Sequence, residues 1–206
     1  MAETPKKSQV REWTKSILLA LGVAMIVRVG IAQAYVIDGP SMEPTLLQNE
    51  RVVVTRFDFG LALPFVHDAV LTWALPNVGD VVIIESPRDG EDLVKRVVGL
   101  PGDVVEIQDG VVLRNGHALA DGHVGTCATA RFREPEPSCE TREERSGDHR
   151  WQTSDSPAES PGWMSPVRVP AEHVFILGDH RDRSNDSRYF GPVDRRLLRG
   201  RARFLD

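Results

Sequence analysis

The chain has 206 residues, enough for one catalytic domain with an appendage and too few for two full domains with separate cores. Its 41% hydrophobic and 27% charged residues are typical of a folded protein, and 14 prolines with 17 glycines favour strands and turns over a helical bundle. The formal net charge of -5 gives phosphate no overall attraction, so we expect no nucleic-acid partner.

The first feature along the chain is an apolar N-terminal stretch. Residues 17–27 are all apolar or small, and the apolar run resumes after Arg28. Trp13 and Tyr35 are spaced to mark the two interfaces of a bilayer core about 30 Å thick. We therefore predict a cytoplasmic N-terminus over 1–15 and one transmembrane helix over 16–36, with the rest of the chain outside because basic residues precede the span. The alternative is a cleaved secretory signal that ends near residue 34.

Beyond this stretch the chain has the pattern of β structure. Short runs rich in valine and isoleucine, separated by glycine and proline, occupy 51–56, 80–85, 92–98, 103–107, 110–114 and 173–177. Asp109-Gly110 and Asn115-Gly116 are typical hairpin turns. We predict a mainly β fold, in which antiparallel sheets form a partly open, barrel-like catalytic domain.

Residues 120–166 interrupt this pattern with both cysteines, five prolines and few apolar residues. We predict a small inserted subdomain or long loop here, within a β domain made of 37–119 and 167–206. Cys127 and Cys139 are expected to form a disulfide because the predicted orientation places them outside the cytoplasm; two buried free thiols are the alternative.

Alternating apolar residues from 57 to 65 predict one apolar face on a strand or hairpin; they are Phe57, Phe59, Leu61, Leu63 and Phe65. This face either packs in the core or touches the outer surface of the membrane. The histidines lack the spacing of a helical metal site, so we expect no metal and no cofactor.

Three separate segments carry residues suited to catalysis. The segment 39–46 places Ser41 in a proline-bounded turn. The segment 92–103 places Lys95 in an otherwise apolar strand, where burial would lower the pKa of its amine; a lysine at a solvated sheet edge is the alternative. The segment 178–193 holds acidic, basic and serine side chains that can form a hydrogen-bonded scaffold.

Together with the N-terminal stretch and Gly79-Asp80-Val81-Val82, these three segments resemble the type I signal peptidases, membrane-anchored Ser-Lys proteases that remove signal peptides from exported proteins. The resemblance covers most of the chain outside 120–166. It implies a serine endopeptidase of the bacterial cytoplasmic membrane, with its catalytic domain on the periplasmic side. The implied partners are the lipid bilayer and the signal peptides of exported preproteins, whereas the oligomeric state stays open.

The resemblance also implies roles for individual residues. Ser41 is the expected nucleophile and Lys95 its general base. Ser184 is expected to hydrogen-bond and orient the Lys95 amine, while Asp186 and Arg188 brace that loop. The pockets for a small-x-small cleavage motif are expected to be lined by Ile37, Met42, Leu46 and Val94, whose alternative role is ordinary core packing.

The sequence leaves the second oxyanion donor and the range of client proteins open. The backbone N–H of Ser41 is the implied first donor, but Gly39 stands where some members carry a serine hydroxyl, so the second donor stays open. Two alternative functions remain: a Ser-Lys protease dedicated to one secretion or conjugation client, and a non-catalytic, membrane-tethered β binding module.

Overall fold

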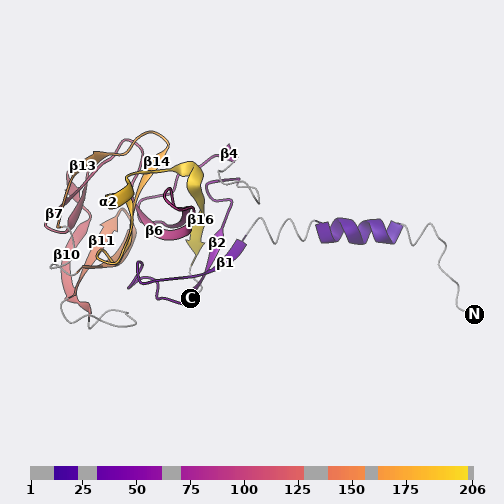
Figure 1. The fold of residues 1–206 in the computed structure, drawn as a ribbon, viewed down its shortest axis with the longest axis horizontal. Helices are drawn as coiled ribbons and strands as arrows, with labels where there is room; N and C mark the ends of the chain where they lie inside the picture. Colours follow the sequence, from indigo (N-terminus) through magenta and orange to yellow (C-terminus); the bar gives the residue numbers. More distant parts are fainter. Residues whose placement is uncertain (1–11, 23–31, 62–70, 128–138, 156–161, 204–206) are drawn as a thin grey trace, which may run out of the picture.

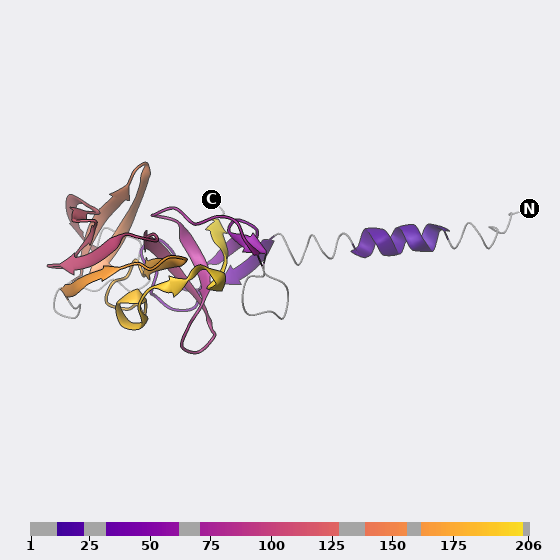
Figure 2. The ribbon, with the colours of Figure 1, turned by 90° about the horizontal axis from the view of Figure 1, so that it is seen from above.

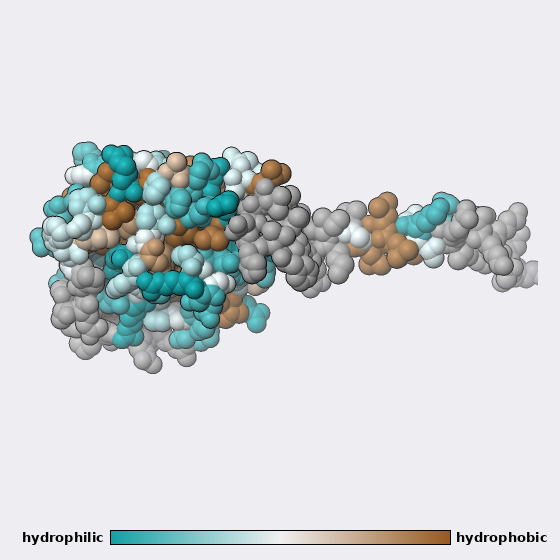
Figure 3. Space-filling view, turned by 45° about the horizontal axis from the view of Figure 1, so that its top comes forward, coloured by the Kyte–Doolittle hydropathy of each residue, from teal (hydrophilic) through white to brown (hydrophobic). Residues whose placement is uncertain are grey.

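The computed structural model describes residues 12–22, 32–61, 71–127, 139–155 and 162–203. Residues 12–22 form an α-helix whose apolar side chains are exposed, among them Leu18 at 68% and Leu19 at 71%. In the space-filling view these side chains form an apolar band, whereas the face of the β part seen there is mainly hydrophilic with small apolar areas (Figure 3).

A seven-stranded antiparallel sheet forms the main body, in the order β1-β2-β16-β5-β6-β14-β15. Its strands are β1 (Ala32–Val36), β2 (Arg51–Thr55), β16 (Leu198–Arg203), β5 (Val81–Glu85), β6 (Asp92–Gly99), β14 (His173–Leu177) and β15 (Val193–Asp194). Strands β1 and β15 are its two edges, so the sheet is open.

Three smaller sheets complete the β part. The four-stranded sheet contains β13 (Trp163–Arg168), β7 (Val104–Gln108), β8 (Val111–Arg114) and β9 (His117–Ala118). The three-stranded sheet contains β10 (Ala120–Thr126), β11 (Glu140–Ser146) and β12 (His149–Asp155), and the two-stranded sheet contains β3 (Gly60–Leu61) and β4 (Leu71–Thr72). Figures 1 and 2 show β7, β10, β11 and β13 at one end of the β part and β1, β2 and β16 at the other.

The hydrophobic pattern explains why the main sheet is buried on both faces. Val81 and Ile83 of β5 pack in one apolar cluster, while Val82 and Ile84 pack in another. A strand covered on both sides has no polar face, which is why β5 is a continuous run of valine and isoleucine. The mainly β, antiparallel fold class is confirmed, and each of the six predicted strands has its counterpart in the structure.

The predicted transmembrane helix over 16–36 is wrong at its C-terminal end. Residues 32–36 form β1 and pair with β2 in continuous register from Ala32↔Thr55 to Val36↔Arg51, because β2 is a run of three valines whose backbone needs a partner strand on this side. Residues 23–31 lie outside the described residues. Within the described part of the chain, no helix is long and apolar enough to cross a membrane.

The apolar face predicted over 57–65 is also only partly present. Residues 56–59 form a turn, in which Phe59 is buried at 2% exposure and Phe57 is 39% exposed. Two residues on opposite sides of a turn do not share a strand face. Leu63 and Phe65 lie outside the described residues.

Most of the described part of 120–166 is the three-stranded sheet of β10, β11 and β12, which packs on the rest of the β part, whereas residues 163–166 begin β13 and pair with β7. Trp151 of β12 is 6% exposed and belongs to the apolar cluster that also contains Val98 and Phe175. Cys127 and Cys139 are joined in a disulfide with their Cα atoms 5.4 Å apart. Closing a loop of this length stabilises a fold by about 3 kcal/mol.

Candidate active site

The turn that carries Ser41 is held by its own backbone and by buried apolar neighbours. The amide of Glu43 donates to the carbonyl of Pro40 at 3.0 Å, and the amide of Leu46 donates to the carbonyl of Met42 at 2.9 Å. Met42 and Leu46 are buried at 0% and 2% exposure, so they fix the turn, whereas Ser41 is only half-buried. The serine hydroxyl is therefore held in place and still accessible.

Lys95 brings its amine to this hydroxyl from the middle of β6. Its Nζ lies 2.8 Å from Ser41 Oγ and donates to the carbonyl oxygen of Val94 at 2.8 Å. Lys95 is 3% exposed, with the apolar side chains of Leu93 and Val97 two residues away on the same strand face. Residues 41 and 95 lie on different segments, so only the folded chain brings them together.

Burial makes the Lys95 amine a weaker base than the amine of an exposed lysine. Desolvation lowers the pKa of Lys95 from 10.5 to about 8, against the attraction of Asp186 and Asp179 for the charged form; Arg188 lowers the pKa further. With this pKa, about a tenth of the amine is uncharged at pH 7 and about half at pH 8. An uncharged amine within hydrogen-bond distance of a serine hydroxyl can accept its proton.

Asp186 organises the loop that covers the other side of the lysine. It caps the short helix α2 (Ser187–Phe190) and accepts hydrogen bonds from the amide of Gly178 at 3.0 Å and from Ser184 Oγ at 2.7 Å. Arg188 pairs with Asp186 at 2.8 Å and also donates to the carbonyl of Arg181. Asp186 and Arg188 thus occupy the bracing positions expected from the sequence.

Ser184 does not have the expected contact. Its hydroxyl donates to Asp186, while the hydrogen bonds of the Lys95 amine go to Ser41 and Val94. The carboxylate is the stronger acceptor because it is charged, which explains why the serine turns toward it. In this structure Ser184 acts on the lysine only through Asp186.

A buried ion pair next to the lysine had no role in the sequence analysis. Arg96, on the opposite face of β6 from Lys95, donates to both carboxylate oxygens of Asp179 at 2.7 and 2.5 Å and to the carbonyl of Gly79 at 2.6 Å. Thr45, in the nucleophile turn, donates to the same carboxylate at 2.5 Å. An arginine inside an apolar strand is the signal that could have revealed this pair, since a buried guanidinium needs a partner.

The four residues expected to line the substrate pockets lie in one apolar cluster. Ile37, Met42 and Leu46 are buried in it, and Val94 and Tyr35 pack against it half-buried. The other members of the cluster come from β2, β5 and β16, so the serine turn packs on one face of the main sheet. Within the described residues, no group of three or more histidine, cysteine, aspartate or glutamate side chains could hold a metal ion.

Gly178 allows the serine turn and the Asp186 loop to approach each other. A Cβ atom at this position would overlap Ser184 Oγ and the carbonyl oxygen of Ser41. We expect Gly178→Ala to lower the free energy of unfolding by about 1–3 kcal/mol, measured by urea denaturation, because one of the two segments must move. Gly162→Ala is the control, since the added methyl group would meet only the amide nitrogen of Gly110 at 3.8 Å, an ordinary van der Waals distance. Equal stability of Gly178→Ala and wild type would contradict this close approach.

The fold and the site thus define a hydrolase-like arrangement, a serine hydroxyl and a buried amine on an open antiparallel sheet. Comparison with known proteins agrees with it. The family model described as "Signal peptidase, peptidase S26" matches residues 10–205. Signal peptidase I of Bacillus licheniformis is 30% identical over 203 residues, 98% of this chain and 91% of that protein. Signal peptidase I of Pseudomonas fluorescens is 34% identical over 191 residues, 90% of this chain and 64% of that protein.

A crystal structure of a signal peptidase I from Enterococcus faecalis V583 is 30% identical, covers 62% of this chain and 97% of that chain, and has a TM-score of 0.41. From the family match and the relatives, the chain belongs to the signal peptidase family, peptidase S26. It is an enzyme, a serine peptidase.

Proposed function

We propose that this chain is a type I signal peptidase that removes signal peptides from exported proteins, with Ser41 as nucleophile and Lys95 as general base. The observation that carries the proposal is the 2.8 Å separation between Lys95 Nζ and Ser41 Oγ, with the lysine at 3% exposure. Desolvation brings the pKa of Lys95 to about 8, close to the working pH that an efficient general base requires.

The proposed reaction proceeds in two halves. The neutral amine of Lys95 takes the hydroxyl proton of Ser41 while Oγ bonds to the carbonyl carbon of the scissile peptide. The resulting tetrahedral intermediate collapses, the peptide C–N bond breaks, and the protonated lysine gives its proton to the leaving amine. A water molecule, deprotonated by the same amine, then hydrolyses the acyl-enzyme and releases the signal peptide with a new carboxylate.

Substrate recognition is proposed to use main-chain pairing and small apolar pockets. Strand β1 is an edge of the main sheet and can pair with an extended substrate segment. Ile37, Met42, Leu46 and Val94 then define shallow pockets that fit only small side chains, which gives the small-x-small preference. The backbone N–H of Ser41 is the proposed first oxyanion donor.

We propose that the peptidase works at the outer surface of the bacterial cytoplasmic membrane. The exposed apolar side chains of the helix over 12–22, and the apolar residues that follow it in the sequence, support an anchor that ends before β1. Trp73 and Leu71 on the β part are 55% and 61% exposed, which supports contact with the bilayer. The proposed catalytic unit comprises 37–119 and 167–206 together with β1, and the insertion comprises 120–166.

The proposal is tested with the full chain in detergent and a purified precursor whose signal peptide ends in Ala-x-Ala. We expect one cut directly after the second alanine, read by sequencing the new N-terminus of the product. A precursor with leucine at both alanine positions is the control and should stay intact, because leucine is too large for the proposed pockets. No cleavage of either precursor, or equal cleavage of both, would contradict the proposed function.

A further inference from the structure

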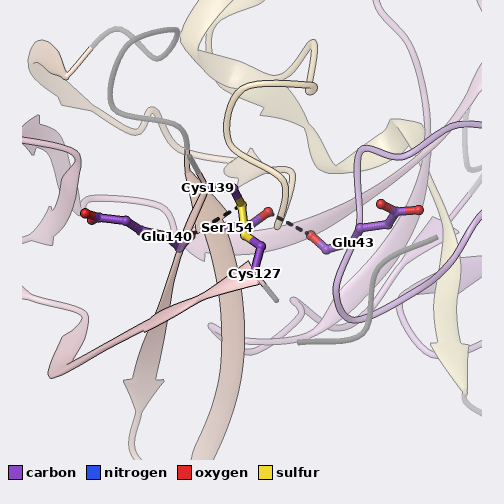
Figure 4. Close-up of a disulfide and its surroundings, with 5 residues drawn as sticks. All are labelled: Glu43, Cys127, Cys139, Glu140 and Ser154. Carbon is purple, nitrogen blue, oxygen red and sulfur yellow. Dashed lines mark hydrogen bonds between the residues drawn. A yellow bond between two sulfur atoms is a disulfide. The ribbon is translucent and has the colours of Figure 1, made fainter. Parts of the chain in front are cut away.

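The inserted sheet contacts both loops of the site through one residue at the end of β12. The amide of Ser154 donates to the carbonyl of Asp179 at 2.8 Å, and the carbonyl of Ser154 accepts from the amide of Arg181 at 2.8 Å. Ser154 Oγ donates to the carbonyl of Glu43 at 3.4 Å, close to the disulfide between Cys127 and Cys139 (Figure 4). The inserted sheet is therefore hydrogen-bonded both to the turn that carries Ser41 and to the loop that follows β14.

A buried carboxylate of the same sheet binds an arginine of the catalytic loop. Glu144, on β11, is 1% exposed and lies 2.7 Å from Arg181, which is 4% exposed. The indole of Trp151, on β12, donates to the same carboxylate oxygen at 2.9 Å. Arg181 also donates to the carbonyl of Gly178 at 3.2 Å, so this ion pair fixes the start of the loop that carries Asp186.

Trp151 links this ion pair to the second buried arginine. The guanidinium of Arg96 stacks over the Trp151 ring, 5.1 Å from the ring centroid, while its Nε and Nη2 donate to the two carboxylate oxygens of Asp179. A Cβ atom at Gly79 would lie 3.0 Å from the Trp151 ring, so the absence of a side chain there allows the ring to reach Arg96. The tryptophan thus holds the guanidinium against the carboxylate.

The buried charges of the catalytic loops and the inserted sheet form three ion pairs. Arg96 pairs with Asp179, Arg181 with Glu144, and Arg188 with Asp186. Arg181 interacts electrostatically with both Asp179 and Asp186, the two carboxylates that favour the charged form of Lys95. The arginines of these pairs therefore offset part of the negative charge of Asp179 and Asp186 near the amine.

We propose that Glu144 and Trp151 of the inserted sheet are positioning residues for the catalytic pair: they hold Arg181 and Arg96 beside Asp179 and Asp186, so that these cations offset part of the negative charge near Lys95. The inference rests on the proposed role of Lys95 as the base. It gives the insertion a function in catalysis, whereas the sequence predicted no catalytic role for residues 120–166.

The proposal predicts opposite effects for the two members of the ion pair. Loss of the Glu144 charge leaves an excess cation near the site, which disfavours the charged amine. Loss of the Arg181 charge leaves Asp179 and Asp186 less compensated, which favours the charged amine. Two further titratable groups are buried on the loops packed against the site, Glu43 and His180, and they are the same in every variant.

The test follows the ionisation of Lys95 directly, in the full chain in detergent. The chain has four lysines and three of them lie within the first 15 residues, so lysine labelled with ¹³C at Cε gives one NMR signal from the β part. Glu144→Gln is expected to move its titration midpoint down, and Arg181→Gln up, by about half a pH unit or more. The double variant Glu144→Gln/Arg181→Gln should titrate within about 0.2 pH unit of wild type, since both charges are gone.

Two controls separate this effect from general damage. Glu143→Gln, next to Glu144 on β11 and paired with Arg150 at the surface, should leave the titration unchanged. Arg181→Lys keeps the charge and should move the midpoint less than Arg181→Gln does. If one of the two single variants does not fold, the other still tests the proposal through the sign of its shift, and the double variant, which leaves neither partner charged and buried alone, shows whether that shift is cancelled.

Shifts of opposite sign that cancel in the double variant are the expected result. The proposal would be overturned if the two single variants shifted the Lys95 titration midpoint in the same direction, or if neither shifted it. It would also be overturned if the midpoint of the double variant differed clearly from that of wild type. The NMR readout needs no substrate, so it is independent of the precursor assay. A chain that does not cleave precursors but whose two single variants shift the Lys95 midpoint in opposite directions would contradict the proposed function and leave this inference standing. Where cleavage is present, the acid limb of kcat/KM should move with the NMR midpoint.

Discussion

Ser41→Ala and Lys95→Ala are each expected to reduce cleavage of an Ala-x-Ala precursor by at least about 10⁴-fold, because each removes one of the two groups that transfer the proton during acylation. The double variant should be no slower than either single variant, since two residues that act as a unit are not additive. Single-turnover product formation, followed by mass spectrometry, measures the loss.

A matched control separates chemistry from folding. Gln48, close to the serine turn but without a part in the proposed reaction, is the control position, and Gln48→Ala should keep wild-type cleavage. Near-ultraviolet circular dichroism should show the same fold in wild type and in all four variants. Cleavage within tenfold of wild type by Ser41→Ala or by Lys95→Ala would refute the proposed pair.

Lys95→Met is expected to increase stability below pH 8. The unfolded chain holds its proton up to about pH 10.5 and the folded chain only up to about pH 8, so folding below pH 8 must desolvate a charged amine. A difference of about 2.5 pKa units corresponds to about 3 kcal/mol at 1.36 kcal/mol per unit. This cost is fully present below pH 8, shrinks as the pH rises toward 10.5, and is absent above that pH.

The measurement is the difference in free energy of unfolding between Lys95→Met and wild type, from urea denaturation at pH 7 and at pH 10.5. The stability advantage of the variant should fall by about 3 kcal/mol between these two values. Lys15→Met is the control, because the Lys15 side chain is 64% exposed and should give no such pH dependence. An advantage that is the same at both pH values would show that the amine is not desolvated.

The sheet could be predicted from the sequence because its strands carry their own signal. β5 and β14 are runs of valine, isoleucine, leucine and phenylalanine that only a strand buried on both faces needs, and Gly-containing turns mark the hairpins. Strand β1 was missed since Ala32-Gln33-Ala34 follows an apolar run without a break, and nothing local distinguishes a helix end from a strand that pairs with β2.

The catalytic pair could be predicted, but its surroundings could not. Ser41 and Lys95 stand out because a serine between prolines and a lysine among valines are exceptional at their own positions. The partners of Arg96 and Arg181 depend on contacts between segments that are 83 and 37 residues apart in sequence. For the same reason Ser184 was assigned to the lysine, whereas the folded loop gives its hydroxyl to a nearer carboxylate.

The position of β16 makes the geometry of the site depend on a strand that is distant from it in sequence. Strand β16, Leu198–Arg203, pairs on one side with β2 and on the other with β5, so it joins the part of the main sheet that precedes Lys95 to the hairpin of β1 and β2 that flanks the serine turn. A chain that ends before Leu198 would lose both ladders of hydrogen bonds. The spacing between residues 41 and 95 is therefore sensitive to truncation more than 100 residues away from either of them.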